Sequence, residues 1–191
     1  MHGSWQLNEL EQMQNLLTSR LRLRPLIMDD AEFILELVTD PDWLTYIGDK
    51  GVHSMDDAKR YISVGPQAMY QQHGLGLLLV ESIESCKPLG LCGLLKRDNL
   101  PMPDVGFAFL AAARGQGNAY EAASAVIVHS FQQRSIDCLA AITSKTNVRS
   151  QALLQKLGFT FKGLHHMDEN DPGSNLFELS KATWLKTASV K

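Results

Sequence analysis

A change of periodicity near residue 117 constrains the fold more than any other feature of this sequence. From Gly74 to Leu110 the short apolar runs LGLLLVESI, PLGLCGLLK and VGFAFL are separated by ESCK and RDNLPMP. Such runs are typical of consecutive strands joined by turns, so we predict an antiparallel meander. After Gly117 the apolar residues follow helical spacing, which predicts a helix packed on that sheet.

The remaining segments predict a mixed α+β fold. Further strands are expected in the alternating stretch LRLR, in CLAAIT (138–143), and in FTFKGL and NLFELS near the end of the chain. Helices are expected in DDAEFILELV, in SMDDAKRYISVGPQAM with a kink or break at Gly65 and Pro66, and in TNVRSQALLQKL. This order predicts a mixed, mostly antiparallel sheet flanked by helices.

The chain length favours one domain with an added N-terminal end. A chain of 191 residues can bury one substantial core, whereas two full domains would be cramped. Residues 18–191 are predicted to form that single domain. Residues 1–17 are predicted to be an extension, either a short amphipathic helix or a loosely docked tail, that could support contacts in a homodimer. Its apolar residues recur near helical spacing: Trp5, Leu10, Met13, Leu16 and Leu17.

Composition excludes several classes of function. The 18 Lys and Arg against 21 Asp and Glu give a formal charge of -3, which provides no general attraction for nucleic acid or for an anionic membrane. Arg20, Arg22 and Arg24 alternate with leucines and are interpreted as the solvated face of a strand. The three cysteines form no CxxC pair, so we expect a reducing compartment and no structural zinc. Without a signal sequence or a long apolar run, a cytoplasmic location is expected.

The segment R-G-Q-G-N-A (114–119) joins the last strand of the meander to the following helix. Glycine permits close approach of the backbone, and a helix start offers N–H groups to an anion. The segment is therefore interpreted either as a phosphate site or as a simple tight turn. A mononucleotide loop is excluded because Asn118 and Ala119 stand where it needs Lys and Ser or Thr. A dinucleotide fingerprint is excluded because these glycines follow a meander.

Two motifs in this order resemble the GNAT superfamily of N-acetyltransferases. R-G-Q-G-N-A (114–119) is similar to that family's Arg/Gln-x-x-Gly-x-Gly/Ala signature, and N-V-R-S-Q-A-L-L-Q-K-L-G-F (147–159) to its Asn-containing last motif. SRLRLRPLIMDDAEFILELVTDP resembles the opening of the branch that includes the Rim group of ribosomal-protein N-terminal acetyltransferases. The similarity runs from about Thr18 to Trp184 and is specific for the superfamily, not for a substrate.

The resemblance implies a GNAT-like sheet of about six or seven strands with splayed central strands at VGFAFL and CLAAIT. Acetyl-CoA, the implied acetyl donor, would lie where these strands part, because their unpaired backbone groups can bind the amides of its pantetheine arm. The diphosphate would rest on N–H groups at the helix start, with Arg114 either adding charge or facing solvent. The implied cofactor-binding residues are Phe109, Leu110, Arg114, Gly115, Gln116, Gly117, Asn118, Ala119, Asn147 and Ser150.

The implied catalytic residues are Ser150 and Asn147. Relatives often protonate the leaving thiolate with a tyrosine of the last helix, but Leu154 occupies that place here. Ser150 matches a serine proposed to serve instead in the Rim-like branch; alternatively, its hydroxyl bonds its own backbone. Asn147 either holds a cofactor amide or caps the helix.

No spacing selects a general base. Candidates are Glu81, Asp104, His165, His166 and Glu169, although adjacent loop histidines are usually solvated. By resemblance, Trp43, Tyr46 and His53 are expected to line the acceptor side.

The expected activity is transfer of an acetyl group from acetyl-CoA to a primary amine by direct attack. The favoured acceptor is a protein N-terminal α-amine. A small-molecule amine, such as an antibiotic, a polyamine or an amino acid, is the alternative. A non-catalytic acyl-CoA-binding module is an alternative of another class, because neither the tyrosine nor an obvious base is present.

Overall fold

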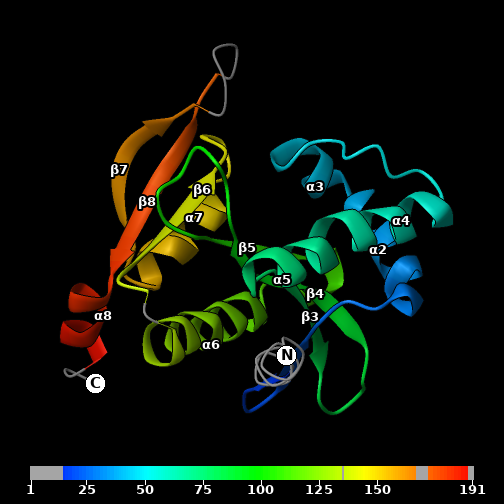
Figure 1. Cartoon of the computed structure of the whole chain (residues 1–191), viewed down its shortest axis with the longest axis horizontal. Helices are drawn as coiled ribbons and strands as arrows, with labels where there is room; N and C mark the ends of the chain where they lie inside the picture. The colour runs from blue at the N-terminus through cyan, green and yellow to red at the C-terminus, as the bar shows by residue number, and fades with distance from the viewer. Residues whose placement is uncertain (1–14, 135, 167–171, 189–191) are drawn as a thin grey trace, which may run out of the picture.

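The computed structural model describes residues 15–134, 136–166 and 172–188 and contains one sheet of eight strands (Figure 1). The strand order is β1-β2-β3-β4-β5-β6-β8-β7, and every neighbouring pair is antiparallel except β5 and β6. The strands are β1 (Leu16–Leu17), β2 (Leu21–Arg24), β3 (Leu77–Ser82), β4 (Pro88–Leu95), β5 (Asp104–Phe109), β6 (Cys138–Thr143), β7 (Thr160–His165) and β8 (Ser174–Ser180). The predicted mixed, mostly antiparallel sheet is confirmed.

The sheet gains a strand at its N-terminal edge. Leu16 and Leu17, which the helical spacing assigned to a helix or tail, pair instead with Leu23 and Arg22 of β2. Two residues cannot show the alternation that identifies a strand, so this pairing had no signal in the sequence. The rest of the predicted N-terminal helix or tail, residues 1–14, lies outside the described residues.

Helices cover both faces of the sheet. They are η1 (Met28–Asp30), α2 (Ala31–Val38), α3 (Pro41–Tyr46), α4 (Met55–Ile62), the π-helical turn η2 (Ser63–Gln67), α5 (Ala68–His73), η3 (Ala111–Ala113), α6 (Asn118–Gln133), α7 (Val148–Lys156) and α8 (Lys181–Ala188). Figure 1 shows α2, α3 and α4 gathered together, well away from β7 and β8.

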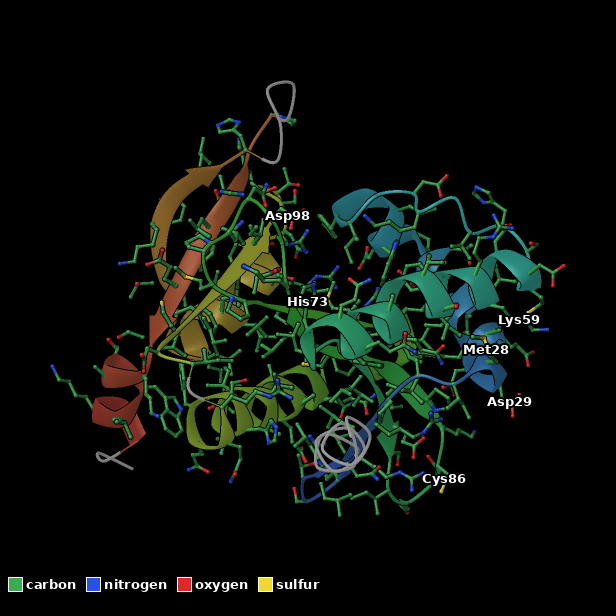
Figure 2. All side chains as sticks on the ribbon, in the orientation of Figure 1. Met28, Asp29, Lys59, His73, Cys86 and Asp98 are labelled. Carbon is green, nitrogen blue, oxygen red and sulfur yellow. The ribbon has the colours of Figure 1, made fainter. Side chains whose placement is uncertain are left out.

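Each face has its own buried cluster. Ile127 and Phe131 of α6 and Leu154 of α7 pack with Val105 and Phe109 of β5 on one face. Ile34 of α2 and Ile62 of α4 pack with Leu79 and Leu91 on the other, where Ala108 and Leu110 also lie. Successive residues of β5 therefore serve opposite faces, as the pleat requires. Figure 2 shows side chains filling the space between these helices and the sheet.

Local signals placed most helix ends. Ser54 caps α4 by accepting a hydrogen bond from the Asp57 N–H at 3.2 Å. At Gly65 and Pro66 the chain neither breaks nor stops, because a π-helical turn carries it from α4 into α5. Asp40 and Pro41 begin α3: Asp40 accepts from the Asp42 N–H at 2.9 Å, and Pro41 occupies the first helical position.

Candidate functional site

The strands β5 and β6 pair at one position and then separate. Their only registered partners are Asp104 and Ala140, and the Ala140 N–H donates to the carbonyl of Pro103 at 2.9 Å. On the other side of β5, the Leu110 N–H donates to Leu89 of β4 at 3.0 Å. Because hydrogen-bonded pairs alternate in an antiparallel ladder, Val105, Phe107 and Phe109 turn their backbone polar groups away from β4.

Beyond the bridge at Asp104 and Ala140, the backbone groups of Phe107 and Phe109 face the space that opens between the two strands, called here the strand gap. Lys181 donates to Asp137 at 2.8 Å across β6 and β8, so the same alternation turns the backbone of Ile142 toward the gap from the β6 side. Unpaired backbone donors and acceptors on both walls can bind an extended ligand that carries amides, as an added strand would. The predicted splay of these central strands is confirmed.

A loop of residues 115–119, called here the glycine loop, follows β5 and η3. Its surrounding carbonyls are occupied: Ala112 accepts from Gln116 Nε2 at 2.7 Å, Ala113 from Asn118 Nδ2 at 3.0 Å, and Gly117 from the Glu121 N–H at 3.0 Å. By contrast, the N–H groups of residues 115–119 donate to no acceptor within the described ranges. The loop therefore presents backbone donors and few acceptors.

Glycine conformation explains why the loop can do this. Gly115 has φ 74° and Gly117 has φ 82°, both in the left-handed region that side chains disfavour. Gly117 is also the N-cap of α6, a helix of 16 residues, so the positive end of the helix dipole lies behind the free N–H groups. Successive amides arranged in this way form an anion-binding concavity, which fits a phosphate or diphosphate.

Arg114 is directed away from the glycine loop. Its Nε donates to the carbonyl of Phe109 at 2.8 Å, and its terminal nitrogens lie 2.6 Å from Asp40 Oδ1 and 2.7 Å from Asp42 Oδ2. The same Asp42 oxygen lies 2.7 Å from Arg149 Nη2 at the start of α7. Burial disfavours the charge of Asp40, but the hydrogen bonds from Arg114 and from the Asp42 N–H outweigh it and lower its pKa.

This network crosses between the two walls of the strand gap. It joins the end of β5 to α3 and then to α7, which follows β6. Sequence reasoning did not identify Asp40, Asp42 or Arg149 as site residues, because no local spacing connects them. In this network Arg114 occupies the carbonyl of Phe109. The carbonyl of Leu110 is also occupied, because it accepts from the Ala113 N–H at 2.9 Å. Of the backbone groups of Phe109 and Leu110, which were predicted to bind the cofactor, the N–H of Phe109 is the one directed into the gap.

Asn147 and Ser150 lie together at the start of α7. Asn147 Oδ1 accepts from the Ser150 N–H at 3.1 Å, which is the helix cap that was one interpretation of this residue. The Nδ2 of Asn147 and the hydroxyl of Ser150 make no hydrogen bond within the described part of the chain. The alternative in which the Ser150 hydroxyl bonds its own backbone is therefore not found in the structure. Both side chains keep a hydrogen-bond donor for a ligand.

The candidate bases have different surroundings. Glu81 is buried and bonded to Arg22 and Arg24 of the neighbouring strand. Asp104, at the start of β5, is 2% exposed and lies 2.9 Å from Arg97 Nε. Its burial raises its pKa, and Arg97 only partly opposes this. His165 ends β7 with its Nε2 buried and without a partner among the described residues, and His166 follows it. Glu169 lies outside the described residues.

The predicted acceptor-side residues belong to α3 and the segment after it. Trp43 is 5% exposed and joins the buried cluster against which Ala108 of β5 and the following Leu110 pack. Tyr46 is half-buried at the end of α3, whereas His53 is exposed and lies 3.4 Å from Asp49. The structure thus brings Trp43 to the strand that borders the gap and leaves His53 at the surface.

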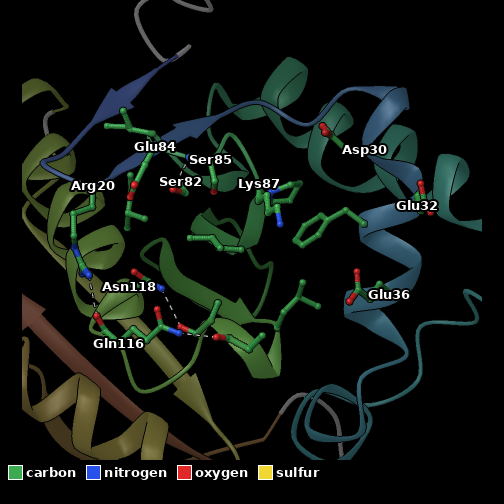
Figure 3. A pocket seen from close by; sticks show the side chains of 18 of the residues that line it. Arg20, Asp30, Glu32, Glu36, Ser82, Glu84, Ser85, Lys87, Gln116 and Asn118 are labelled. Atoms are coloured by element: carbon green, nitrogen blue, oxygen red, sulfur yellow. Dashed lines mark hydrogen bonds between the residues drawn. The ribbon is translucent and has the colours of Figure 1, made fainter.

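A pocket of about 900 Å³ adjoins the glycine loop on the side of α2 and the β3–β4 hairpin. Figure 3 shows Gln116 and Asn118 on one side of it and Glu32 and Glu36 on the other. It contains neither Asn147 nor Ser150, so it does not coincide with the strand gap. Because α7 borders the gap, we place the candidate site there and not in this pocket.

Within the described residues, no group of three or more His, Cys, Asp or Glu side chains could hold a metal ion. None of the described helices has the length and apolar character needed to cross a bilayer.

Comparison with known proteins gives the family of this chain. A family model described as an acetyltransferase (GNAT) domain matches residues 20–160. The chain is also 28% identical over 149 residues to protein YkkB of Bacillus subtilis (strain 168), which covers 76% of this chain and 85% of that protein.

Solved structures share this fold over most of the chain. The acetyltransferase from Agrobacterium tumefaciens str. C58 superimposes with a TM-score of 0.75 at 24% identity, over 87% of this chain and 94% of that one. RimL, a ribosomal L7/L12 alpha-N-protein acetyltransferase solved in complex with coenzyme A, gives a TM-score of 0.67 at 13% identity, over 87% and 98% of the two chains. The predicted fold class is therefore confirmed.

Proposed function

Because this chain belongs to the GNAT acetyltransferase family, we propose that it transfers the acetyl group of acetyl-CoA to a primary amine, and that the acceptor is the N-terminal α-amine of a protein. One observation carries the proposal: a loop of free backbone N–H groups, at residues 115–119, adjoins two strands that have parted. The N–H groups of the loop can bind the anionic oxygens of a diphosphate, and the backbone groups of the gap can bind the amides of a pantetheine arm.

The residues of the site fit the cofactor in parts. The N–H groups of the glycine loop would hold the diphosphate, and the N–H of Phe109 would bind the pantetheine arm, together with the Nδ2 of Asn147. When bound, acetyl-CoA would supply a thioester carbonyl for attack by a neutral amine. The hydroxyl of Ser150, which has no other partner in the described ranges, would give a proton to the departing sulfur.

The absence of an assigned base agrees with an α-amine acceptor. At pH 7.5 an α-amine with a pKa near 7.8 is about one-third neutral, whereas an aliphatic amine near 10.4 is neutral in only about one part in a thousand. This difference corresponds to about 3 kcal/mol, so an α-amine needs little help to expose its lone pair. RimL, which shares the fold, is described as acting on a protein α-amine.

Two measurements test the proposal. Isothermal titration with acetyl-CoA is expected to give saturable binding, and a folded protein without heat of binding would end the idea. Thiol release should then be measured with a panel of peptides of different N-terminal residues and with a panel of small amines. With a peptide, kcat/KM should rise with pH and level off near pH 8, whereas with an aliphatic amine it should rise toward pH 10. Turnover with the small amines alone would instead favour a metabolite acceptor.

A further inference from the structure

Glu121, in the first turn of α6, accepts several hydrogen bonds from the chain segment that precedes β2. Its Oε1 accepts from Thr18 Oγ1 at 2.6 Å, from Ser19 Oγ at 3.1 Å and from the Arg20 N–H at 3.0 Å. Its Oε2 lies 2.7 Å from both Nε and Nη2 of Arg20. Burial opposes the charge of this carboxylate, yet the hydrogen bonds from Thr18 and Arg20 outweigh it and lower the pKa of Glu121.

The guanidinium of Arg20 also reaches the glycine loop. Its Nη1 donates to the carbonyl of Gln116 at 3.1 Å, as Figure 3 shows. A Cβ on Gly117 would lie 3.4 Å from Nη2, so the side chain rests against that glycine. Arg20 is therefore held at one end by Glu121 and bonded to the loop at the other.

The position of this bond determines where the next N–H points. In a planar trans peptide, the carbonyl and the following N–H point in opposite directions. Because the carbonyl of Gln116 points at Arg20, the N–H of Gly117 points away from it. Arg20 thus lies on the side of the loop that lines the pocket, and the N–H of Gly117 points away from that side.

From this geometry we infer that Arg20 is a positioning residue for the diphosphate of the cofactor. Arg20 orients the peptide between Gln116 and Gly117, and Glu121 anchors Arg20. This inference rests on the proposed binding of acetyl-CoA. It differs from the signature of the family, because the arginine that supports the loop comes from the segment just before β2 and not from position 114.

The two neighbouring arginines show that this contact is particular to Arg20. Arg22 and Arg24 alternate with leucines on β2, which begins just after Arg20, but they bind Glu81, and Arg24 also binds Asp30. The solvated-face interpretation of the three arginines therefore holds least for Arg24, whose side chain is 21% exposed. The side chain of Arg20 is 51% exposed and still makes two separate polar contacts. Glu121 neutralises the charge of Arg20. Arg20 therefore acts more by orienting the Gln116–Gly117 peptide than by attracting the diphosphate electrostatically.

The experiment compares Arg20→Met with wild type and with Arg22→Met as a matched control. Methionine keeps the apolar stem and removes the donors. The KM for acetyl-CoA of Arg20→Met is expected to rise about tenfold, with kcat within about twofold, because the loss of one oriented N–H weakens binding of the diphosphate. Arg22→Met, which leaves Glu81 bonded to Arg24, should change neither constant by more than about twofold.

Two further measurements separate orientation from stability and from charge. A variant that merely unfolds in part would lower kcat and leave KM unchanged, which would overturn the inference. Acetyl-pantetheine lacks the diphosphate, so its kcat/KM should be the same for Arg20→Met and wild type. Arg20→Lys keeps the charge but not the forked geometry, and it should stay at least about threefold worse than wild type in KM. A wild-type KM in Arg20→Lys would show that charge alone matters, and this result would also overturn the inference.

Failure here is distinct from failure of the proposed function. If wild type neither binds nor uses acetyl-CoA, the proposed function is wrong. If wild type uses acetyl-CoA and Arg20→Met has an unchanged KM, the proposed function stands and the role of Arg20 is wrong.

Discussion

Arg114 Nη2 lies 2.6 Å from Asp40 Oδ1, and this ion pair attaches the loop after β5 to the first turn of α3. The signature arginine of the family is thus part of a structural junction. It also keeps the carbonyl of Phe109 bonded at the edge of the strand gap. The junction has consequences for stability that can be measured apart from catalysis.

Replacing Arg114 by alanine should destabilise the fold by about 2 kcal/mol, because it leaves the largely buried Asp40 without its cationic partner. Urea unfolding at pH 7 measures this loss. The matched control is Arg60→Ala, since Arg60 is 70% exposed and pairs with Asp57 at 3.4 Å. That variant should lose no more than about 0.5 kcal/mol. Equal losses for both variants would contradict the structural role of Arg114.

Ser150→Ala should lower kcat by about tenfold to a hundredfold, because the departing thiolate loses its proton donor. The KM for acetyl-CoA should change by no more than about threefold. Unfolding should be nearly unaffected, since the hydroxyl has no hydrogen bond in the described part of the chain. Steady-state kinetics and urea unfolding of the same preparation give both answers. An unchanged kcat would remove Ser150 from the mechanism.

Asn147 can be tested by separating its two functions. Asn147→Ala removes the cap of α7 and should cost about 1 kcal/mol of stability as well as affinity for coenzyme A. Asn147→Asp keeps the capping oxygen but not the Nδ2 donor. It should therefore restore stability, measured by urea unfolding, without restoring affinity, measured by titration calorimetry. If aspartate restored both, the amide would have no direct contact with the cofactor.

Gly117→Ala should destabilise the fold by about 1 to 2 kcal/mol and weaken binding of coenzyme A, because a side chain at φ 82° is strained. Thermal unfolding with and without coenzyme A reports both effects. Gly65→Ala is the control, since a Cβ there meets nothing within 4 Å and the residue has no positive φ. It should be neutral or slightly stabilising. The glycine loop would lose its special status if both variants behaved alike.

The stability difference between wild type and Glu121→Gln should depend on pH. The pKa of Glu121 in the folded protein is below its ordinary value of 4.5, so its ionisation stabilises the fold above that pH. The contribution disappears as pH falls through the lowered value. Urea unfolding should show a constant advantage of wild type, about 1 kcal/mol, between pH 6 and 8. The advantage should shrink below about pH 4.5. A difference that grew on acidification would contradict this assignment.

The sequence alone predicted the elements whose causes are local. Alternating apolar residues and turn segments predicted the meander, and helical spacing after Gly117 predicted α6. The glycines at 115 and 117 predicted an unusual junction, and the structure places both in the left-handed region. Asn147 and Ser150 were also brought together by spacing, since a helix cap and its partner lie within one turn.

Only the tertiary structure decided which charges meet. Arg114 bonds Asp40, 74 residues away, and Arg20 bonds Glu121, 101 residues away. The partner of a charged side chain cannot be identified from the sequence, because the pairing depends on how sheet and helices pack. Periodicity and glycine conformation, by contrast, act within a few residues. For this reason the sequence by itself determined the strand order of the meander and the glycine loop, and packing decided that Arg114 supports α3 while Arg20 supports the loop.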